Sequence, residues 1–312
     1  MSKYRTCLPQ LGQITFLSDG GIETSLIYDD GLELPYFAAF DLLRNHEGYA
    51  ALRRYYHRYI SIARTKDAGF ILESPTWRAS PDWATRLDYS MEKLDDLNRR
   101  AVSLMQELRE EFEVPLSPIV ISGCIGPRGD GYDPGAIMSA EEAERYHQRQ
   151  IRTFADTNVD MVTAITMTNI NEAVGIVNAA KAARVPVAIS FTVETDGRLP
   201  TGEALALAIN TVDTATERAP VYFMVNCAHP SHFTDVLEQD GAWTSRIKGV
   251  RANASRCSHA ELDAMTELDP GNPGELALQY LELKNRLPGL RVLGGCCGTN
   301  QHHIEEISKL CI

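Results

Sequence analysis

Two patterns of hydrophobic and polar positions alternate along the chain. Short apolar runs, typical of buried parallel strands, are separated by longer stretches in which apolar residues recur every three or four positions, as on one face of a helix. Within 52–63 that helical spacing is followed by Leu52, Tyr55, Tyr56, Tyr59, Ile60 and Ala63. The apolar runs predict eight strands, at Ile14–Ser18, Phe70–Glu73, Ile119–Ser122, Met161–Thr166, Val187–Phe191, Val221–Val225, Ile247–Arg251 and Arg291–Leu293.

Eight strands that alternate with helices predict a (β/α)₈ TIM barrel. Ser139 with Glu142, and Ser258 with Glu261, have the spacing of capping boxes at helix starts. A doubly wound open sheet is the competing architecture, but the stretch 19–23, Asp-Gly-Gly-Ile-Glu, lacks the glycine spacing of its phosphate loop. No linker or low-complexity segment interrupts the pattern, so we expect one barrel domain over residues 1–312.

Composition narrows the classes of partner. The chain has 312 residues, of which 44% are apolar and 23% charged, and its net charge is −12. This acidic balance argues against nucleic acid and gives no support for binding to an anionic membrane. Residues 1–6 are not followed by an apolar signal core, and no apolar run is long enough to cross a bilayer. We therefore expect a cytoplasmic protein that acts on small molecules; its oligomeric state stays open, with a homo-oligomer as one option.

Seven cysteines are spread through the chain, and two of them, Cys296 and Cys297, are adjacent in the run 294–299, Gly-Gly-Cys-Cys-Gly-Thr. An odd number at wide spacing does not suit a disulfide framework, and no CxxC pair is present. The flanking glycines let the backbone turn where the last predicted strand ends, so both sulfurs can point at one place. Two buried thiols or a vicinal disulfide are the alternatives to a metal site.

In a TIM barrel the active residues lie at the carboxyl ends of the strands. Asn226 and Cys227 end the sixth predicted strand, so Cys227 can meet Cys296 and Cys297 across the top of the barrel. Three thiolates suit Zn²⁺ and leave one position open for a substrate. Another thiolate competes best for that position. The pattern therefore predicts a site that activates a thiol as a nucleophile toward a methyl group.

Several of these stretches together resemble the zinc-dependent homocysteine S-methyltransferase family. They are 19–21 (Asp-Gly-Gly), 126–127 (Gly-Pro), 226–227 (Asn-Cys) and 294–299, and the resemblance runs from about Leu17 to Ile304. It implies a (β/α)₈ barrel and a methyltransferase that makes methionine from homocysteine, as in methionine biosynthesis. It also implies that the zinc ligands are Cys227, Cys296 and Cys297, that Asn226 shapes the site beside the metal, and that Asp19 and Gly20 line the amino-acid pocket.

The resemblance breaks at two positions. After the fourth strand the family usually carries a glutamate that holds the amino group of homocysteine, and Ile165 stands there. An isoleucine cannot bind an ammonium. Either another acid replaces the glutamate, with Glu73 at the end of the second strand as the candidate, or the substrate is a different thiol or methylated compound. Arg251 differs from the family's usual residues after the seventh strand and is a candidate for binding a carboxylate. A third option is a zinc- or thiol-binding protein without transferase activity.

Other residues receive weaker assignments. Trp77 stands where the family has an aromatic residue and either contacts a cationic methyl donor or packs at the rim. The loop 123–135, rich in glycine, proline and aspartate, is interpreted as a lid or substrate loop, with Asp130 and Asp133 as turn residues. His229 is a candidate neighbour of the metal, while His302 and His303 are expected to begin the last helix. The remaining cysteines, Cys7, Cys124, Cys257 and Cys311, are expected to play no part in the site. No cobalamin or folate domain fits within the chain, so the expected donor is small, such as S-methylmethionine, S-adenosylmethionine or a betaine.

Overall fold

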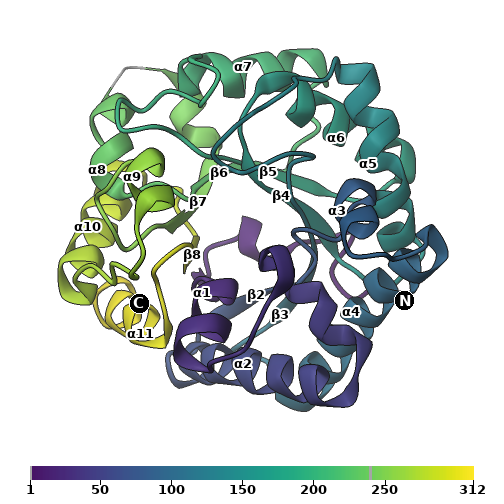
Figure 1. Ribbon diagram of the computed structural model, residues 1–312. Helices are drawn as coiled ribbons and strands as arrows, with labels where there is room; N and C mark the ends of the chain where they lie inside the picture. The colour runs from purple at the N-terminus through teal and green to yellow at the C-terminus, as the bar shows by residue number, and fades with distance from the viewer. Residues whose placement is uncertain (1, 239–240) are drawn as a thin grey trace.

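A closed parallel barrel forms the centre of the protein. The computed structural model describes residues 2–238 and 241–312. Within them eight strands pair in chain order, and β1 also pairs with β8 (Figure 1). The strands are β1 (Phe16–Leu17), β2 (Gly69–Glu73), β3 (Ile119–Ile125), β4 (Met161–Met167), β5 (Val187–Phe191), β6 (Tyr222–Asn226), β7 (Ile247–Ala252) and β8 (Val292–Gly295). The predicted TIM barrel is confirmed. The open-sheet alternative is wrong, because an open sheet has no pairing between its two edge strands.

Three of the eight predicted strands differ from the observed ones by two or more residues at one end: the third runs on from Ser122 to Ile125, and the first and last also differ. The first is shorter than expected, since Ile14 lies before β1 and is 42% exposed. The apolar character of Ile14 therefore does not mark a buried strand position. The last strand is longer, because Gly294 and Gly295 continue the ladder opposite Arg251 and Ala252 of β7. The turn that carries the cysteine pair therefore begins later than the apolar run indicates.

The helices lie around the barrel, most of them on its outside (Figure 1). They are α1 (Ile22–Thr24), α2 (His46–Thr65), α3 (Pro81–Arg86), α4 (Met91–Phe112), α5 (Ala140–Ala155), α6 (Ile170–Ala183), α7 (Leu205–Ala215), α8 (Pro230–Phe233), α9 (His259–Ala264), α10 (Pro273–Arg286) and α11 (Gln301–Cys311). The capping boxes predicted at Ser139 and Ser258 begin α5 and α9. None of the helices in the described part of the chain is long and apolar enough to cross a membrane.

Side chains of each strand alternate between the outside and the inside of the barrel. On β2, Phe70 and Leu72 belong to the core between strands and helices, whereas Ile71 belongs to a second core within the barrel. The inner core is closed at the amino ends of the strands by Leu8 from the N-terminal segment. Its strand residues include Phe16, Ile71, Val120, Met161, Ala188, Tyr222, Met224 and Val292.

The next inward positions toward the carboxyl ends of the strands are polar. By the same alternation they are Glu73, Ser122, Thr163, Ser190, Asn226 and Arg251, all buried. Neighbours in this layer bond to one another: the Ser122 and Thr163 hydroxyls are 2.7 Å apart, and Ser190 Oγ donates to Asn226 Oδ1 at 2.6 Å. Apolar side chains thus fill the barrel toward the amino ends of the strands, and a layer of polar side chains lies above them toward the carboxyl ends.

Candidate metal centre and active-site pocket

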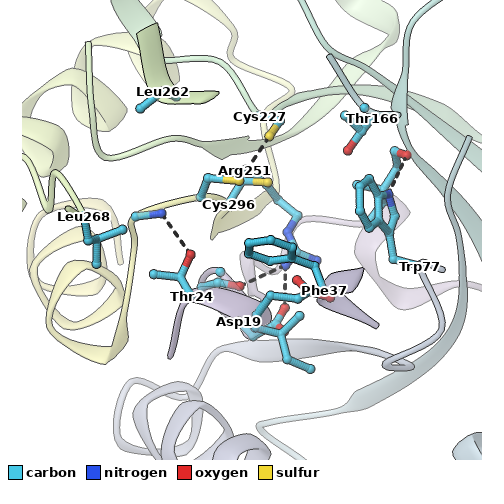
Figure 2. A pocket seen from close by; sticks show the side chains of 18 of the residues that line it. Asp19, Thr24, Phe37, Trp77, Thr166, Cys227, Arg251, Leu262, Leu268 and Cys296 are labelled. Carbon is cyan, nitrogen blue, oxygen red and sulfur yellow. Dashed lines mark hydrogen bonds and ion pairs between the residues drawn. The ribbon is translucent and has the colours of Figure 1, made fainter. Parts of the chain in front are cut away.

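Three cysteine sulfurs meet at the carboxyl end of the barrel. Cys227 follows β6 directly, while Cys296 and Cys297 follow β8. The Sγ atoms of Cys227 and Cys297 are 3.5 Å apart, and all three sulfurs lie within 4.8 Å of one another (Figure 2). A tetrahedral zinc with Zn–S bonds of about 2.3 Å needs sulfurs about 3.8 Å apart. The cluster therefore fits Zn²⁺ with three protein ligands, as the spacing of β6 and β8 predicts.

The backbone is bent to bring these sulfurs together. Cys227 adopts φ 54°, a left-handed conformation that is uncommon for a residue with a Cβ. Its amide donates to the Arg251 carbonyl at 3.1 Å, and its own carbonyl accepts a hydrogen bond from His259 Nε2 at 2.7 Å. Contacts on both sides thus hold the cysteine in the turn that directs its sulfur toward the cysteines after β8.

Asn226 connects the metal centre to β4. Its Oδ1 accepts the Thr166 amide at 2.9 Å, and its Nδ2 donates to Thr166 Oγ1 at 2.8 Å and faces Cys296 Sγ at 3.8 Å. Thr166 needs this support because it has φ 65° and lies at an irregularity in the β4–β5 ladder. A bulge of this kind turns a neighbouring side chain into a site. Asn226 therefore positions both a cysteine and the strand end opposite it.

Mutual hydrogen bonding couples the three thiols. Bonds from Cys227 and Cys297, together with the nearby Arg251 cation, lower the pKa of Cys296 well below its usual range. The pKa of Cys227 rises, because it bonds to Cys296 and Cys297 and is buried. The cluster thus retains one negative charge more readily than separate thiols would, which is a favourable starting state for binding a soft cation.

Tyr132 lies over the sulfurs, and sequence reasoning missed it. Its hydroxyl is 3.4 Å from Cys227 Sγ and 3.3 Å from Cys297 Sγ, and its ring stacks on His259 with centroids 4.0 Å apart. The loop 123–135 was predicted to face the substrate, and Gly131 and Tyr132 do line the pocket. As predicted, Asp130 acts as a turn residue, since its carboxylate accepts the Tyr132 amide at 2.9 Å. The one sequence signal that could have identified Tyr132 is its place in a loop that was predicted to face the substrate.

A pocket of about 320 Å³ opens beside the sulfurs. Every residue predicted for substrate or metal, apart from Asn226, lines it: Asp19, Gly20, Glu73, Trp77, Cys227, Arg251, Cys296 and Cys297. Ile165 lines it too, and its carbonyl accepts a hydrogen bond from Trp77 Nε1 at 3.3 Å. Figure 2 shows Trp77 and Thr166 on one side of the cysteines and Leu262 and Leu268 on the other. The departure seen in the sequence therefore lies in the wall of the pocket.

The floor of the pocket carries an ion pair. Arg251 Nη2 is 2.7 Å from Asp19 Oδ1, and Tyr55 donates to the other oxygen of Asp19 at 2.9 Å. Burial raises the pKa of Asp19, although the Arg251 cation opposes this shift. Burial lowers the pKa of Arg251, but Asp19 and Glu73 more than offset it and raise it above its usual value. Asp19 therefore already has its cation within the protein.

Glu73 differs from Asp19 in having an unused oxygen. Its side chain is buried at the end of β2, and Oε2 finds no hydrogen-bond partner among the described residues. Burial raises the pKa of Glu73 to about 7, against the opposing effect of Arg251. A buried carboxylate oxygen without a donor is costly unless a ligand supplies one. Glu73 is thus the acid in this layer that still has an oxygen to offer.

His259, rather than the predicted His229, contacts a cysteine of the cluster. His229 accepts the Ser231 amide at 3.2 Å and begins α8, and it does not line the pocket. His259, which the sequence did not single out, holds the Cys227 carbonyl. His302 and His303 lie in the first turn of α11, as predicted. Of the other cysteines, Cys124 lines the pocket but stands outside the cluster of three.

Comparison with known proteins gives a consistent result. The family model described as homocysteine S-methyltransferase matches residues 16–311. "Homocysteine S-methyltransferase 1" from Brassica oleracea var. italica is 23% identical over 310 residues, which cover 93% of this chain and 91% of that protein. "Selenocysteine Se-methyltransferase" from the same organism is 24% identical, over 77% of this chain and 74% of its own length.

Solved structures agree on the fold. The homocysteine methyltransferase MmuM from Escherichia coli in its oxidized form superposes with a TM-score of 0.77 at 20% identity, and covers 98% of this chain and 99% of its own. Its metallated form gives a TM-score of 0.75 at 18% identity, with the same coverage. At these identities the likeness establishes the barrel, and the chemistry must be argued from the residues above.

Proposed function

The chain belongs to the homocysteine S-methyltransferase family, and we propose that it is a zinc-dependent enzyme that moves a methyl group from a small donor to the thiol of homocysteine, giving methionine. The observation that carries the proposal is the sulfur cluster at the mouth of the pocket. Three cysteines at the spacing of a tetrahedral zinc, in a pocket open on one side, are a site for a metal that also takes an exogenous thiol. The metallated form of the Escherichia coli relative supports a metal here.

Cys227, Cys296 and Cys297 would hold the Zn²⁺, which lowers the pKa of a bound thiol so that it is a thiolate at neutral pH. The chain's own residues do the rest. Asn226 keeps Cys296 and the end of β4 in place, and the pocket walls bring the acceptor sulfur and the donor methyl into reacting geometry. Apolar side chains at the rim, among them Phe37, Leu262 and Leu268, exclude water from the nucleophile.

Glu73 and Arg251 are proposed to bind the amino-acid end of homocysteine. The free oxygen of Glu73 accepts from the ammonium, which takes over the role that Ile165 cannot perform. The hydrogen bonds of Arg251 to described residues use Nε and Nη2, so Nη1 remains as a donor to the substrate carboxylate. Asp19 acts by orienting Arg251, and Gly20 does the same through its carbonyl, 3.3 Å from Nη2.

A second candidate is the same chemistry on another thiol or selenol. It is favoured by Ile165 and by the pairing of Asp19 with Arg251, which together remove two acids from the region where an ammonium would bind. The name of the Brassica selenocysteine Se-methyltransferase shows that relatives act on more than one acceptor. A cytoplasmic location and small-molecule substrates are part of the proposal.

The test is a methyl-transfer assay on zinc-loaded protein. Homocysteine, selenocysteine and the deaminated analogue 4-mercaptobutyrate would each be offered with an excess of S-methylmethionine, S-adenosylmethionine or glycine betaine, and the methylated products quantified. Methionine as the main product supports homocysteine. A preference for another acceptor supports the second candidate. Tight zinc and thiol binding without transfer from any donor would favour a binding protein instead.

A further inference from the structure

Several charged residues that line the pocket are not used by the chemistry described so far, and Glu23 and Arg78 are two of them with opposite charges. Glu23 lies on α1, after β1, and Arg78 lies in the loop after β2. Both line the same pocket as Cys296 and Cys297. The inference that follows rests on the proposed methyl transfer and concerns the donor rather than the acceptor.

Arg78 has an unused donor that faces an enclosed environment. Its side chain is 11% exposed, and it donates to the Tyr36 carbonyl and, at 3.3 Å, to Asp130 Oδ2. The third nitrogen, Nε, is buried and has no acceptor within residues 2–238 and 241–312. A guanidinium N–H is a strong donor whose burial without an acceptor is unfavourable, so a ligand oxygen is the natural partner.

Aromatic rings fix the direction of this guanidinium. Its Cζ lies 4.0 Å from the centroid of the Trp83 ring and 5.0 Å from that of Trp77. Stacking of this kind restricts the rotation of arginine and presents its edge to one side. Trp77 itself lines the pocket and is held by its bond to the Ile165 carbonyl. Arg78 is therefore a preset anion receptor at the rim.

Glu23 carries the opposite charge, and the next residue of α1 contacts the turn of the cysteine pair, where Thr24 Oγ1 accepts the Gly298 amide at 3.2 Å. Burial raises the pKa of Glu23 to about 7; the charge of Cys296 raises it further, and the Arg78 cation lowers it. The Glu23 carboxylate pairs with no cation within 4.0 Å in the described part of the chain, Arg78 included. Because both side chains line the same pocket, a ligand bound there can contact both.

We propose that Glu23 and Arg78 bind the methyl donor as a zwitterion, with its onium cation at Glu23 beside the sulfur cluster and its carboxylate at Arg78. The reaction itself sets this orientation. The methyl carbon must approach the acceptor sulfur, so the positive end of the donor belongs on the side of Cys296. The anionic end then reaches the arginine at the rim.

The chemical step balances with these charges. As the acceptor thiolate forms its new S–CH₃ bond, the bond between that methyl and the donor sulfonium breaks, and its electron pair stays on the donor sulfur. The donor leaves as a neutral thioether that retains only its carboxylate. Glu23 therefore attracts the donor before transfer and releases its cationic contact afterwards, which favours the exchange of product for a new donor.

Two sulfonium probes that differ in one group test the assignment. Dimethylsulfonioacetate carries the carboxylate, and trimethylsulfonium lacks it. Each would be offered to zinc-loaded protein saturated with homocysteine, and kcat/KM measured for wild type, Arg78→Met and Glu23→Gln. The control is Arg128→Met, which removes a neighbouring arginine that is half exposed, pairs with Asp82 and does not line the pocket.

Wild type should prefer dimethylsulfonioacetate by about 10- to 100-fold, the usual effect of one charged hydrogen bond. Arg78→Met should abolish that preference, Glu23→Gln should raise KM for both probes and keep the ratio, and Arg128→Met should change neither. An equal response of wild type to the two probes, a preference that survives Arg78→Met, or no transfer from either probe would overturn the inference. Homocysteine binding, followed through the charge-transfer band of Co²⁺-substituted protein, tests the proposed function separately, because it requires no donor.

Discussion

Arg251 of β7 and Asp19, which follows β1, form a buried ion pair across β8, with Nη2 and Oδ1 2.7 Å apart. The pair fits because β8 has no side chain at the position that faces inward between them. Gly294 is in register with Arg251, and a Cβ there would lie 1.9 Å from Ser18 Oγ. Asp19, which was predicted to line the substrate pocket, is therefore engaged by Arg251, which lies 232 positions further along the chain.

Arg251→Met tests the energetic importance of this pair. The substitution leaves Asp19 buried without a cation, and we expect it to lower the free energy of unfolding by about 3–5 kcal/mol. The double variant Asp19→Asn, Arg251→Met should recover much of that loss, because no uncompensated charge remains. Urea denaturation measures both. Replacing Arg99, which pairs with Asp96 on the surface, should cost about 1 kcal/mol or less. Equal destabilisation in the single and double variants would contradict the argument.

Removal of any one zinc ligand is the second prediction. Cys227→Ser, Cys296→Ser and Cys297→Ser should each lose most of the bound zinc after dialysis, since two thiolates hold the ion far less well than three. Cys124→Ser is the matched control: Cys124 is buried in the same pocket but lies outside the cluster. Metal content per chain, measured by atomic emission, decides the matter. Full zinc occupancy in all three variants would exclude the cluster as the metal site.

The strands and the metal cluster could be predicted from the sequence because both depend on chain-local signals. Apolar runs mark buried strands, and a residue just after a barrel strand must lie at the barrel mouth. Cys227 and Cys296 are therefore placed by strand position alone. The position of Asn226 at the end of β6 was predicted in the same way, whereas its role beside the metal was implied by the family resemblance.

The partners of these residues could not be predicted, because they depend on side-chain direction at long range. Nothing near Tyr132 in the sequence indicates that its hydroxyl reaches two sulfurs, or that its ring stacks on His259. His229 was a candidate because it lies close to Cys227 along the chain, yet the intervening turn makes it the cap of α8. The pairing of Asp19 with Arg251 likewise follows from an empty position at Gly294 that only the barrel geometry reveals.

The third prediction concerns Asn226. In Asn226→Ala the Thr166 amide loses its acceptor and Cys296 loses a nearby donor, so zinc affinity should fall by about 10- to 100-fold. Asn98→Ala is the control. Asn98 is buried, as Asn226 is, and its side chain donates to the backbone carbonyls of Ala79 and Leu94, but it lies on α4 outside the pocket. Competition with a chromophoric chelator measures the affinity. A similar loss in both variants would show a general effect on folding rather than a role in positioning the ligand.

Glu73→Gln gives the fourth prediction. If Glu73 binds the ammonium of homocysteine, the variant should bind homocysteine about 10- to 100-fold more weakly, since a charged hydrogen bond is lost. The same variant should bind 4-mercaptobutyrate, which has no amino group, as well as wild type does. Titration of Co²⁺-substituted protein with each thiol provides both dissociation constants. Unchanged homocysteine affinity would end the assignment of Glu73 to the amino group.

The pH dependence of thiol binding provides the fifth prediction. Because burial raises the pKa of Glu73 to about 7, its carboxylate is protonated below that pH and charged above it. Attraction for the homocysteine ammonium therefore increases as pH rises through 7 and levels off above about 8, where ionisation is nearly complete. Ionisation of the thiol also varies with pH, but it affects 4-mercaptobutyrate in the same way. The ratio of the two affinities isolates Glu73: it should rise by up to about tenfold per pH unit below pH 7 and be flat in Glu73→Gln. A ratio that is independent of pH in wild type, or one that rises equally in the variant, would place the ammonium elsewhere in the pocket.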